Sequence, residues 1–107
     1  MHRVIRYYKA NAVSRGLLWN LDAADCERLF EAACSYCGAL RSMGCASRAH
    51  RYEYNGIDRV HNAIGYTVLN SVSCCKHCNR MKGVLGRDAF LGHLARVLEY
   101  CDRTSKT

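Results

Sequence analysis

Two pairs of cysteines in this chain have the spacing of metal ligands. Two residues separate Cys34 from Cys37, and two residues separate Cys75 from Cys78. This spacing lets both thiolates of a pair reach one ion from a single turn, and two such pairs complete the tetrahedron that zinc prefers. Four sulfur ligands close the coordination sphere. The pattern therefore predicts a structural zinc site that stabilises the fold and takes no direct part in catalysis.

The second pair leaves alternatives at neighbouring positions. Cys74 directly precedes Cys75 and could replace it as a ligand, although the two-residue spacing favours Cys75. His77 lies inside the second pair and could replace a thiol, but four cysteines already fill the site. The remaining cysteines are expected to be small buried hydrophobic residues: Cys26, Cys45, Cys74 and Cys101.

Length, charge and the distribution of apolar residues limit the class of protein. The chain has 107 residues, which corresponds to one domain with a modest core, and its net charge is +7. The charged N-terminus lacks the apolar run of a signal peptide, and no stretch is apolar enough to cross a membrane. We therefore expect a cytoplasmic protein in which paired cysteines bind zinc. Its basic surface suits either nucleic acid or plain solvation.

The N-terminal third is predicted to be mainly helical. Apolar residues recur at helical spacing over residues 3–15, and a short apolar stretch, residues 17–21, is expected to be extended. Asp22 has the side chain of an N-cap, with Asp25 at the third position of the helix that follows, about residues 23–33. One stripe of this second helix is expected to be buried: Cys26, Leu29, Phe30 and Ala33.

The remainder of the chain alternates between irregular, strand and helical patterns. Residues 38–51 show no clear period and predict a loop, whereas residues 52–60 and 66–73 predict two strands joined by a turn. A short helix is expected near residues 78–82 and a longer one over residues 87–100. The core-facing positions of the last helix are predicted to be Phe90, Leu91, Leu94, Val97 and Leu98.

Residues 55–83 carry a combination of motifs: GIDRV, then GY, then Asn70, then CKHCNRMK. This combination resembles an HNH endonuclease domain of the zinc-stapled ββα-metal class. The preceding residues also resemble the segment before the first cysteine pair in small phage-type HNH proteins, so the resemblance covers about residues 7–98. It implies an α+β fold in one domain. Its parts would be a helical extension (1–33), a zinc-bound ββα core (34–83) and a C-terminal helix and tail (84–107).

The resemblance also implies a second metal. Asp58 and Asn79 would bind a catalytic Mg²⁺ or Mn²⁺ through a carboxylate and an amide oxygen, which are hard donors that suit these ions. The ion would stabilise negative charge during phosphodiester hydrolysis. Asn70 would hold the loop between the strands by hydrogen bonds to the backbone. The alternative role for Asp58 is that of a turn carboxylate or of a salt-bridge partner of Arg59 or Arg80.

The sequence departs from the family pattern at the general base. A histidine usually follows the metal-binding aspartate, but here the position holds Arg59, which stays protonated at any working pH. Three interpretations are open. In the first, His61 replaces the base, because alternate residues of a strand point to one face. In the second, Arg59 clamps the phosphate and catalysis is partial without a protein base. In the third, the site binds but does not cut.

The expected function is hydrolysis of DNA phosphodiester bonds with low sequence specificity. A monomer would nick, and a double-strand break would need a homodimer or two independent events. The alternatives are an inactive nucleic-acid-binding or inhibitor protein on the same scaffold, and a zinc module that binds only proteins. If the chain is viral, the expected location is the host cytoplasm. Phosphate contacts are expected from four basic residues: Arg51, Arg59, Arg80 and Lys82.

Overall fold

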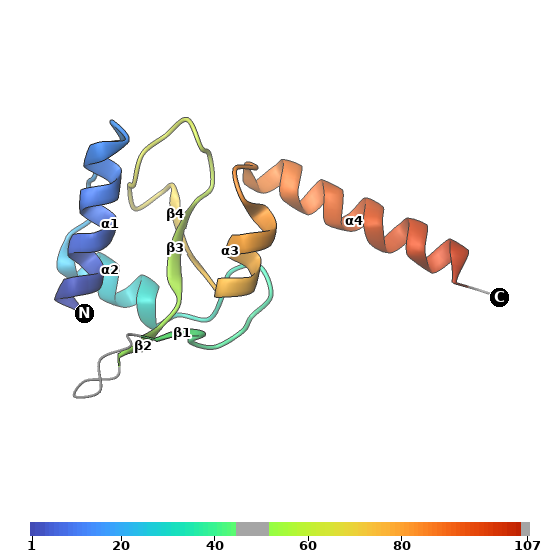
Figure 1. Ribbon diagram of the computed structural model, residues 1–107, viewed down its shortest axis with the longest axis horizontal. Helices are drawn as coiled ribbons and strands as arrows, with labels where there is room; N and C mark the ends of the chain where they lie inside the picture. Colours follow the sequence, from blue (N-terminus) through green and yellow to red (C-terminus); the bar gives the residue numbers. More distant parts are fainter. Residues whose placement is uncertain (45–51, 106–107) are drawn as a thin grey trace.

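The computed structural model describes residues 1–44 and 52–105, and in this part of the chain four helices and two small sheets form a mixed α+β fold (Figure 1). The α+β class expected from the sequence is confirmed. No helix among these residues is both long and apolar enough to span a bilayer. The elements in chain order are α1 (His2–Ser14), α2 (Ala23–Glu31), β1 (Met43–Gly44), β2 (Glu53–Tyr54), β3 (Gly56–Arg59), β4 (Ser71–Cys74), α3 (Lys76–Lys82) and α4 (Arg87–Thr104).

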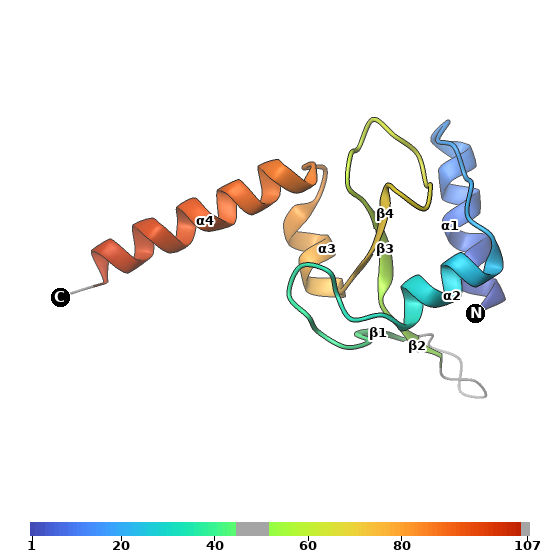
Figure 2. The ribbon, with the colours of Figure 1, turned by 180° about the vertical axis from the view of Figure 1, so that it is seen from behind.

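The centre of the fold is a ββα unit. Strands β3 and β4 pair antiparallel, with Asp58 opposite Val72 and Gly56 opposite Cys74, and α3 begins two residues after β4 ends. Figures 1 and 2 show α1 and α2 on one side of this hairpin and α3 on the other. The hairpin therefore separates the N-terminal helices from the helix that carries the second cysteine pair.

The predicted strands are longer than the observed ones. The stretch 52–60 is divided into β2 and β3 at Asn55, because its buried amide donates hydrogen bonds of 2.9 and 3.0 Å to two backbone carbonyls in the segment after α2. The second strand begins at Ser71 and not at residue 66, because Asn70 ends a turn in which its N–H donates to the Thr67 carbonyl at 3.1 Å. The predicted tight turn is therefore a longer loop, which frames one end of the hairpin.

One further difference concerns the segment between the cysteine pairs. The predicted loop over residues 38–51 contains strand β1, which pairs antiparallel with β2. Residues 45–51, which include Cys45 and Arg51, lie outside the described residues.

The N-terminal core depends on the way in which α2 begins and ends. The Asp22 carboxylate accepts a hydrogen bond from the Asp25 N–H at 2.8 Å, and the Asp25 carboxylate accepts one from the Asp22 N–H at 3.0 Å. This capping box confirms the predicted N-cap. The helix ends at Glu31, so Ala33 is exposed and not buried as predicted. The core cluster contains Val4, Ala12, Leu21, Cys26, Leu29, Phe30, Ile57 and Tyr66.

Helix α4 extends away from the rest of the fold (Figure 1). Phe90 is buried and packs edge-on against Tyr36, with ring centroids 5.5 Å apart. Leu94 is half-buried, but the prediction is wrong for the other three positions, because no described element covers the outer turns: Leu91 is 37%, Val97 42% and Leu98 70% exposed. Cys101 on the same helix is also exposed, contrary to expectation, whereas Cys26 and Cys74 are buried.

Gly65 allows two backbone segments to approach closely. The Tyr66 N–H donates to the Leu18 carbonyl at 2.7 Å, and the Asn20 N–H donates to the Tyr66 carbonyl at 2.8 Å. A Cβ at Gly65 would lie 2.4 Å from the Leu18 carbonyl oxygen and 2.6 Å from the Leu18 nitrogen. Both are backbone atoms, and the Leu18 carbonyl is already held by the hydrogen bond from Tyr66, so they cannot move aside cheaply. Only glycine fits where the segment after α1 crosses the hairpin loop.

We expect Gly65→Ala to lower the free energy of unfolding by about 2 kcal/mol or more, because the added methyl group overpacks a backbone contact. The control is Gly92→Ala on α4, where a Cβ meets nothing within 4 Å. This control should be neutral or stabilising by up to about 1 kcal/mol through helix propensity. Urea unfolding followed by circular dichroism measures both, and a fully stable Gly65→Ala variant would contradict the close packing.

Candidate metal centre and adjoining cleft

The four predicted zinc ligands converge on one point. The sulfur atoms of Cys34, Cys37, Cys75 and Cys78 all lie within 4.8 Å of one another, and 3.6 Å separates Cys37 Sγ from Cys75 Sγ. Zinc–sulfur bonds of about 2.3 Å in a tetrahedron place the sulfur atoms about 3.8 Å apart. This four-cysteine cluster is therefore a possible metal site whose dimensions and donor atoms are compatible with structural zinc.

Local backbone structure prepares both cysteine pairs to bind a metal. The Tyr36 N–H donates to Cys34 Sγ, and the Cys78 N–H donates to Cys75 Sγ, each at 3.4 Å. Burial acts to raise the pKa of the Cys34 thiol, but backbone N–H donors outweigh this effect and lower the pKa to about 6. The thiolate, which is the form that binds metal, is thereby favoured at Cys34.

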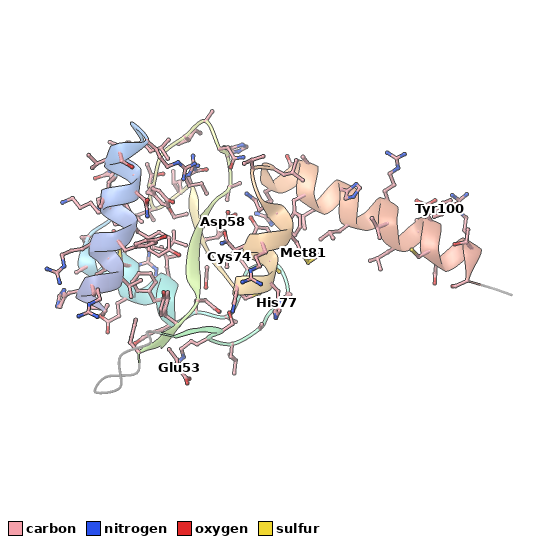
Figure 3. The ribbon with its side chains drawn as sticks, viewed as in Figure 1. Glu53, Asp58, Cys74, His77, Met81 and Tyr100 are labelled. Atoms are coloured by element: carbon pink, nitrogen blue, oxygen red, sulfur yellow. The ribbon has the colours of Figure 1, made fainter. Side chains whose placement is uncertain are left out.

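The structure distinguishes Cys75 from the two alternative ligands. The buried thiol of Cys74 lies outside the four-cysteine cluster and contacts the Cys75 carbonyl at 3.5 Å. Burial, and then the nearby charge of Asp58, raises the pKa of Cys74, so its neutral thiol is favoured. His77 is exposed on α3 and also lies outside the cluster (Figure 3).

Asp58 is the acid at the centre of the site, between β3 and α3 (Figure 3). Its Oδ2 accepts a hydrogen bond from the Tyr36 hydroxyl at 2.7 Å, and its Oδ1 accepts one from the Lys82 ammonium at 3.2 Å. Burial, and then this hydrogen bond to Asp58, raises the pKa of Tyr36, so the phenol remains a donor. Tyr36 was not predicted as a site residue from the sequence. Its one signal was a phenol placed between two predicted metal ligands.

Lys82 is in the interior of the protein and not at a phosphate-binding surface. Its side chain is 1% exposed. The buried ammonium is compensated by hydrogen bonds that it donates to Asp58 Oδ1 and to the Arg59 carbonyl, both at 3.2 Å. The predicted phosphate contact is therefore wrong for this arrangement. The predicted partner of an Asp58 salt bridge is also wrong. Asp58 pairs with Lys82, and not with Arg59 or Arg80.

Arg59 braces the loop that follows β3. Its Nη1 donates to the carbonyls of Asn62 and Ile64, and its guanidinium carbon lies 5.6 Å from the ring centroid of Tyr66. The residue is 8% exposed. One nitrogen of the guanidinium is thus engaged by the loop carbonyls, and a phosphate clamp at Arg59 stays a prediction.

The same loop positions His61 and Asn70. Strand β3 ends at Arg59 and the next two residues form a bend, so the expected placement of His61 on a continuous strand is wrong. The His61 side chain is exposed. Asn70 is buried and makes the expected loop hydrogen bonds: its Oδ1 accepts from the His61 N–H at 2.9 Å, and its Nδ2 donates to three carbonyls of the loop.

A cleft of about 290 Å³ opens beside Asp58. Asp58, Arg59 and Asn79 line it, so the structure brings both expected ligands of a catalytic ion to one cavity. His61 does not line this cleft, and neither does Arg80, which is exposed on α3. Asp58 thus faces both the cleft and two internal donors, and it can be held in place while it remains available to a ligand.

The chain is similar to part of a longer viral protein. The chain is 32% identical over 93 residues to "Uncharacterized protein R423" of Acanthamoeba polyphaga mimivirus. The alignment covers 87% of this chain but 16% of the viral protein, so the chain corresponds to a small part of that relative. No family model matches the sequence. No solved structure matches it.

We expect Lys82→Met to lower the free energy of unfolding by about 3–5 kcal/mol, because it leaves the Asp58 carboxylate buried without its ionic partner. Lys76→Met is the control, since Lys76 lies exposed on the same helix. Its effect should be within about 0.5 kcal/mol. Chemical unfolding of both variants measures the difference. Equal stability of the two variants would contradict the buried ion pair and would support the phosphate contact that the sequence predicted for Lys82.

Proposed function

We propose that this chain is a metal-dependent DNA endonuclease of the HNH type, which hydrolyses phosphodiester bonds and nicks one strand at a time. The observation that carries the proposal is the cleft that Asp58 of β3 and Asn79 of α3 share, next to the four-cysteine cluster. The two residues come from the two parts of a ββα unit. A net charge of +7 supports a polyanionic substrate.

The donor atoms of the cleft fit a hard divalent cation. Asp58 offers carboxylate oxygens and Asn79 an amide oxygen, and Mg²⁺ is usually held by one or two carboxylates while water and substrate phosphate complete its coordination. Each Asp58 oxygen accepts one hydrogen bond and keeps a further lone pair. When bound, Mg²⁺ or Mn²⁺ would stabilise negative charge on the scissile phosphate and the leaving oxygen.

The role of the chain's own residues is to position the acid. Tyr36 and Lys82 hold Asp58 from two sides, so its carboxylate is oriented before substrate binds. No histidine lines the cleft in the part of the chain that the structure describes, and Arg59 cannot accept a proton. A positioned base contributes about a hundred- to ten-thousand-fold in rate. We therefore propose a slow hydrolase that works without a protein base.

A second function is favoured by the ion pair itself. The Lys82 ammonium, 3.2 Å from Asp58 Oδ1, competes with a divalent cation for the same carboxylate. If the ammonium keeps its place, the chain is an inactive nucleic-acid-binding or inhibitor protein on the same scaffold. For either function we propose a cytoplasmic protein that binds DNA as a monomer or homodimer. Zinc would be the structural ion of the four-cysteine cluster.

The zinc proposal predicts that the purified protein holds one zinc ion per chain and unfolds when a strong chelator removes it. Cys37→Ser should lose most of the zinc and melt at a lower temperature, because it removes one of four ligands. Cys101→Ser is a matched control, since both cysteines are exposed and free but only Cys37 is in the cluster. Elemental analysis and thermal melts give the answer. Zinc-free wild-type protein that is fully folded would exclude the proposal.

The endonuclease proposal predicts relaxation of supercoiled plasmid with Mg²⁺ or Mn²⁺. Asp58→Asn and Asn79→Ala should each slow nicking at least about 100-fold, because the first removes the negative charge of a metal ligand, the second removes a ligand, and the bound ion contributes several kcal/mol in the transition state. His61→Ala should keep the wild-type rate, as should the control His77→Ala. Wild-type protein that shifts DNA on a gel but never relaxes it would leave only the binding function. Full activity in Asp58→Asn would show that another nuclease is responsible.

A further inference from the structure

A second, larger cavity adjoins the Asp58 cleft. It has a volume of about 630 Å³ and lies between α1 and the ββα unit, and we call it the α1 groove. Arg15, Ile57, Tyr66 and Asn79 line both the groove and the cleft. The two cavities are therefore parts of one continuous depression, which runs along α1 and ends beside Asp58.

One face of α1 forms a wall of this groove. Arg3, Tyr7, Asn11 and Arg15 follow one another at intervals of four residues, and all four line the groove. Residues four apart are neighbours on one face of a helix. A rise of about 1.5 Å per residue puts Arg3 and Arg15, which is the C-cap of α1, about 18 Å apart along the axis. The wall thus presents a cation near each end, with an aromatic ring and an amide between them.

These side chains are available to a ligand. Within residues 1–44 and 52–105, neither Arg3 nor Arg15 forms a salt bridge, and both are exposed. Tyr7 is 66% exposed, and its ring contacts Tyr8 edge-on with centroids 5.8 Å apart. The oxygen of the half-buried Tyr8 accepts a hydrogen bond from the Ile57 N–H at 3.2 Å, which fixes α1 to β3. The groove wall is therefore held rigidly against the strand that carries Asp58.

We propose that the α1 groove binds a single nucleic-acid strand, with phosphates on Arg3 and Arg15 and one unstacked base on Tyr7. Sites for single strands combine a positively charged groove with aromatic rings on which bases stack. An intact duplex keeps its bases stacked on one another and offers no free base face to Tyr7. The inference rests on the proposed function in one respect: the strand in the groove is the one whose phosphate reaches the Asp58 cleft. Single-stranded or frayed nucleic acid is then the preferred substrate.

Fluorescence anisotropy tests the binding step separately from cleavage, using a labelled single-stranded oligonucleotide and the same sequence as a blunt duplex, without added Mg²⁺ or Mn²⁺. The wild type should bind the single strand more tightly. Arg3→Ala/Arg15→Ala should weaken this binding and reduce the slope of log affinity against log salt by about 1.4, the value for two lost single-strand phosphate contacts. Arg6→Ala/Lys9→Ala removes the same charge from exposed positions of α1 outside the groove and should leave the slope unchanged.

The aromatic contact has its own matched pair of variants. Tyr7→Ala should weaken single-strand binding about fivefold or more, through loss of a stacked base, and Tyr7→Phe should retain it. Tyr100→Ala is the control, because Tyr100 is 60% exposed on α4, far from the groove (Figure 3). Equal losses from the two double-charge variants, no loss in Tyr7→Ala, or a preference for duplex would each overturn the proposal.

Failure of the groove and failure of the endonuclease give different results. Single-strand binding without Mg²⁺ or Mn²⁺ and plasmid nicking with them are separate readouts, since Arg3 and Tyr7 line the groove whereas Asp58 lines the cleft. Groove-dependent binding without any nicking would leave the groove proposal standing and remove the endonuclease. Nicking that is equally fast in Arg3→Ala/Arg15→Ala and in Arg6→Ala/Lys9→Ala would keep the endonuclease and remove the groove as its substrate site.

Discussion

Four thiols brought within 4.8 Å of one another are the constraint on which the rest of the structure depends. As thiolates they would repel one another, and a cation between them would make the arrangement favourable. Cys37 and Cys75 touch across 38 positions of sequence, so a metal there closes a long loop in a chain with a modest core. The positions of the site residues depend on this loop closure, because they lie beside the four cysteines in the sequence. Tyr36 lies between two ligands, Asn79 follows Cys78 directly, and Lys82 is one turn further along α3.

The interior charges then decide which basic residues are available to a polyanion. Lys82 compensates Asp58, and Arg59 satisfies two loop carbonyls and lies against Tyr66. Buried charges persist only when they are paired or hydrogen-bonded, so neither cation can leave without a large cost. Fewer basic side chains near the cleft are therefore available to contact a polyanion than the net charge of the chain suggests. The arginines that remain unpaired and exposed beside the groove are those of α1.

The parts of the fold and site that could be predicted are those determined by local sequence. The Asp22 cap is a relation between residues three apart, and the cysteine pairs need only their spacing and one tetrahedral ion. The contact of Tyr36 with Asp58 joins residues 22 apart and carries no local signal. Helical periodicity identified an apolar face on α4 but cannot say whether anything covers it. His61 was misplaced because period-two reasoning holds only while a strand continues, and β3 ends at Arg59.

Strand β3 also explains why binding and chemistry can be separate properties of this molecule. Successive residues of a strand point to opposite faces. Ile57 joins the N-terminal core, where its N–H is bonded to Tyr8 of α1, whereas Asp58 faces Tyr36 and Lys82 on the α3 side. One peptide unit therefore connects the wall of the groove to the acid of the cleft. Side chains on the exposed face of α1 can change without moving Asp58. A shift in the register of β3 would instead exchange its two faces, and both the α1 groove and the Asp58 cleft would be lost.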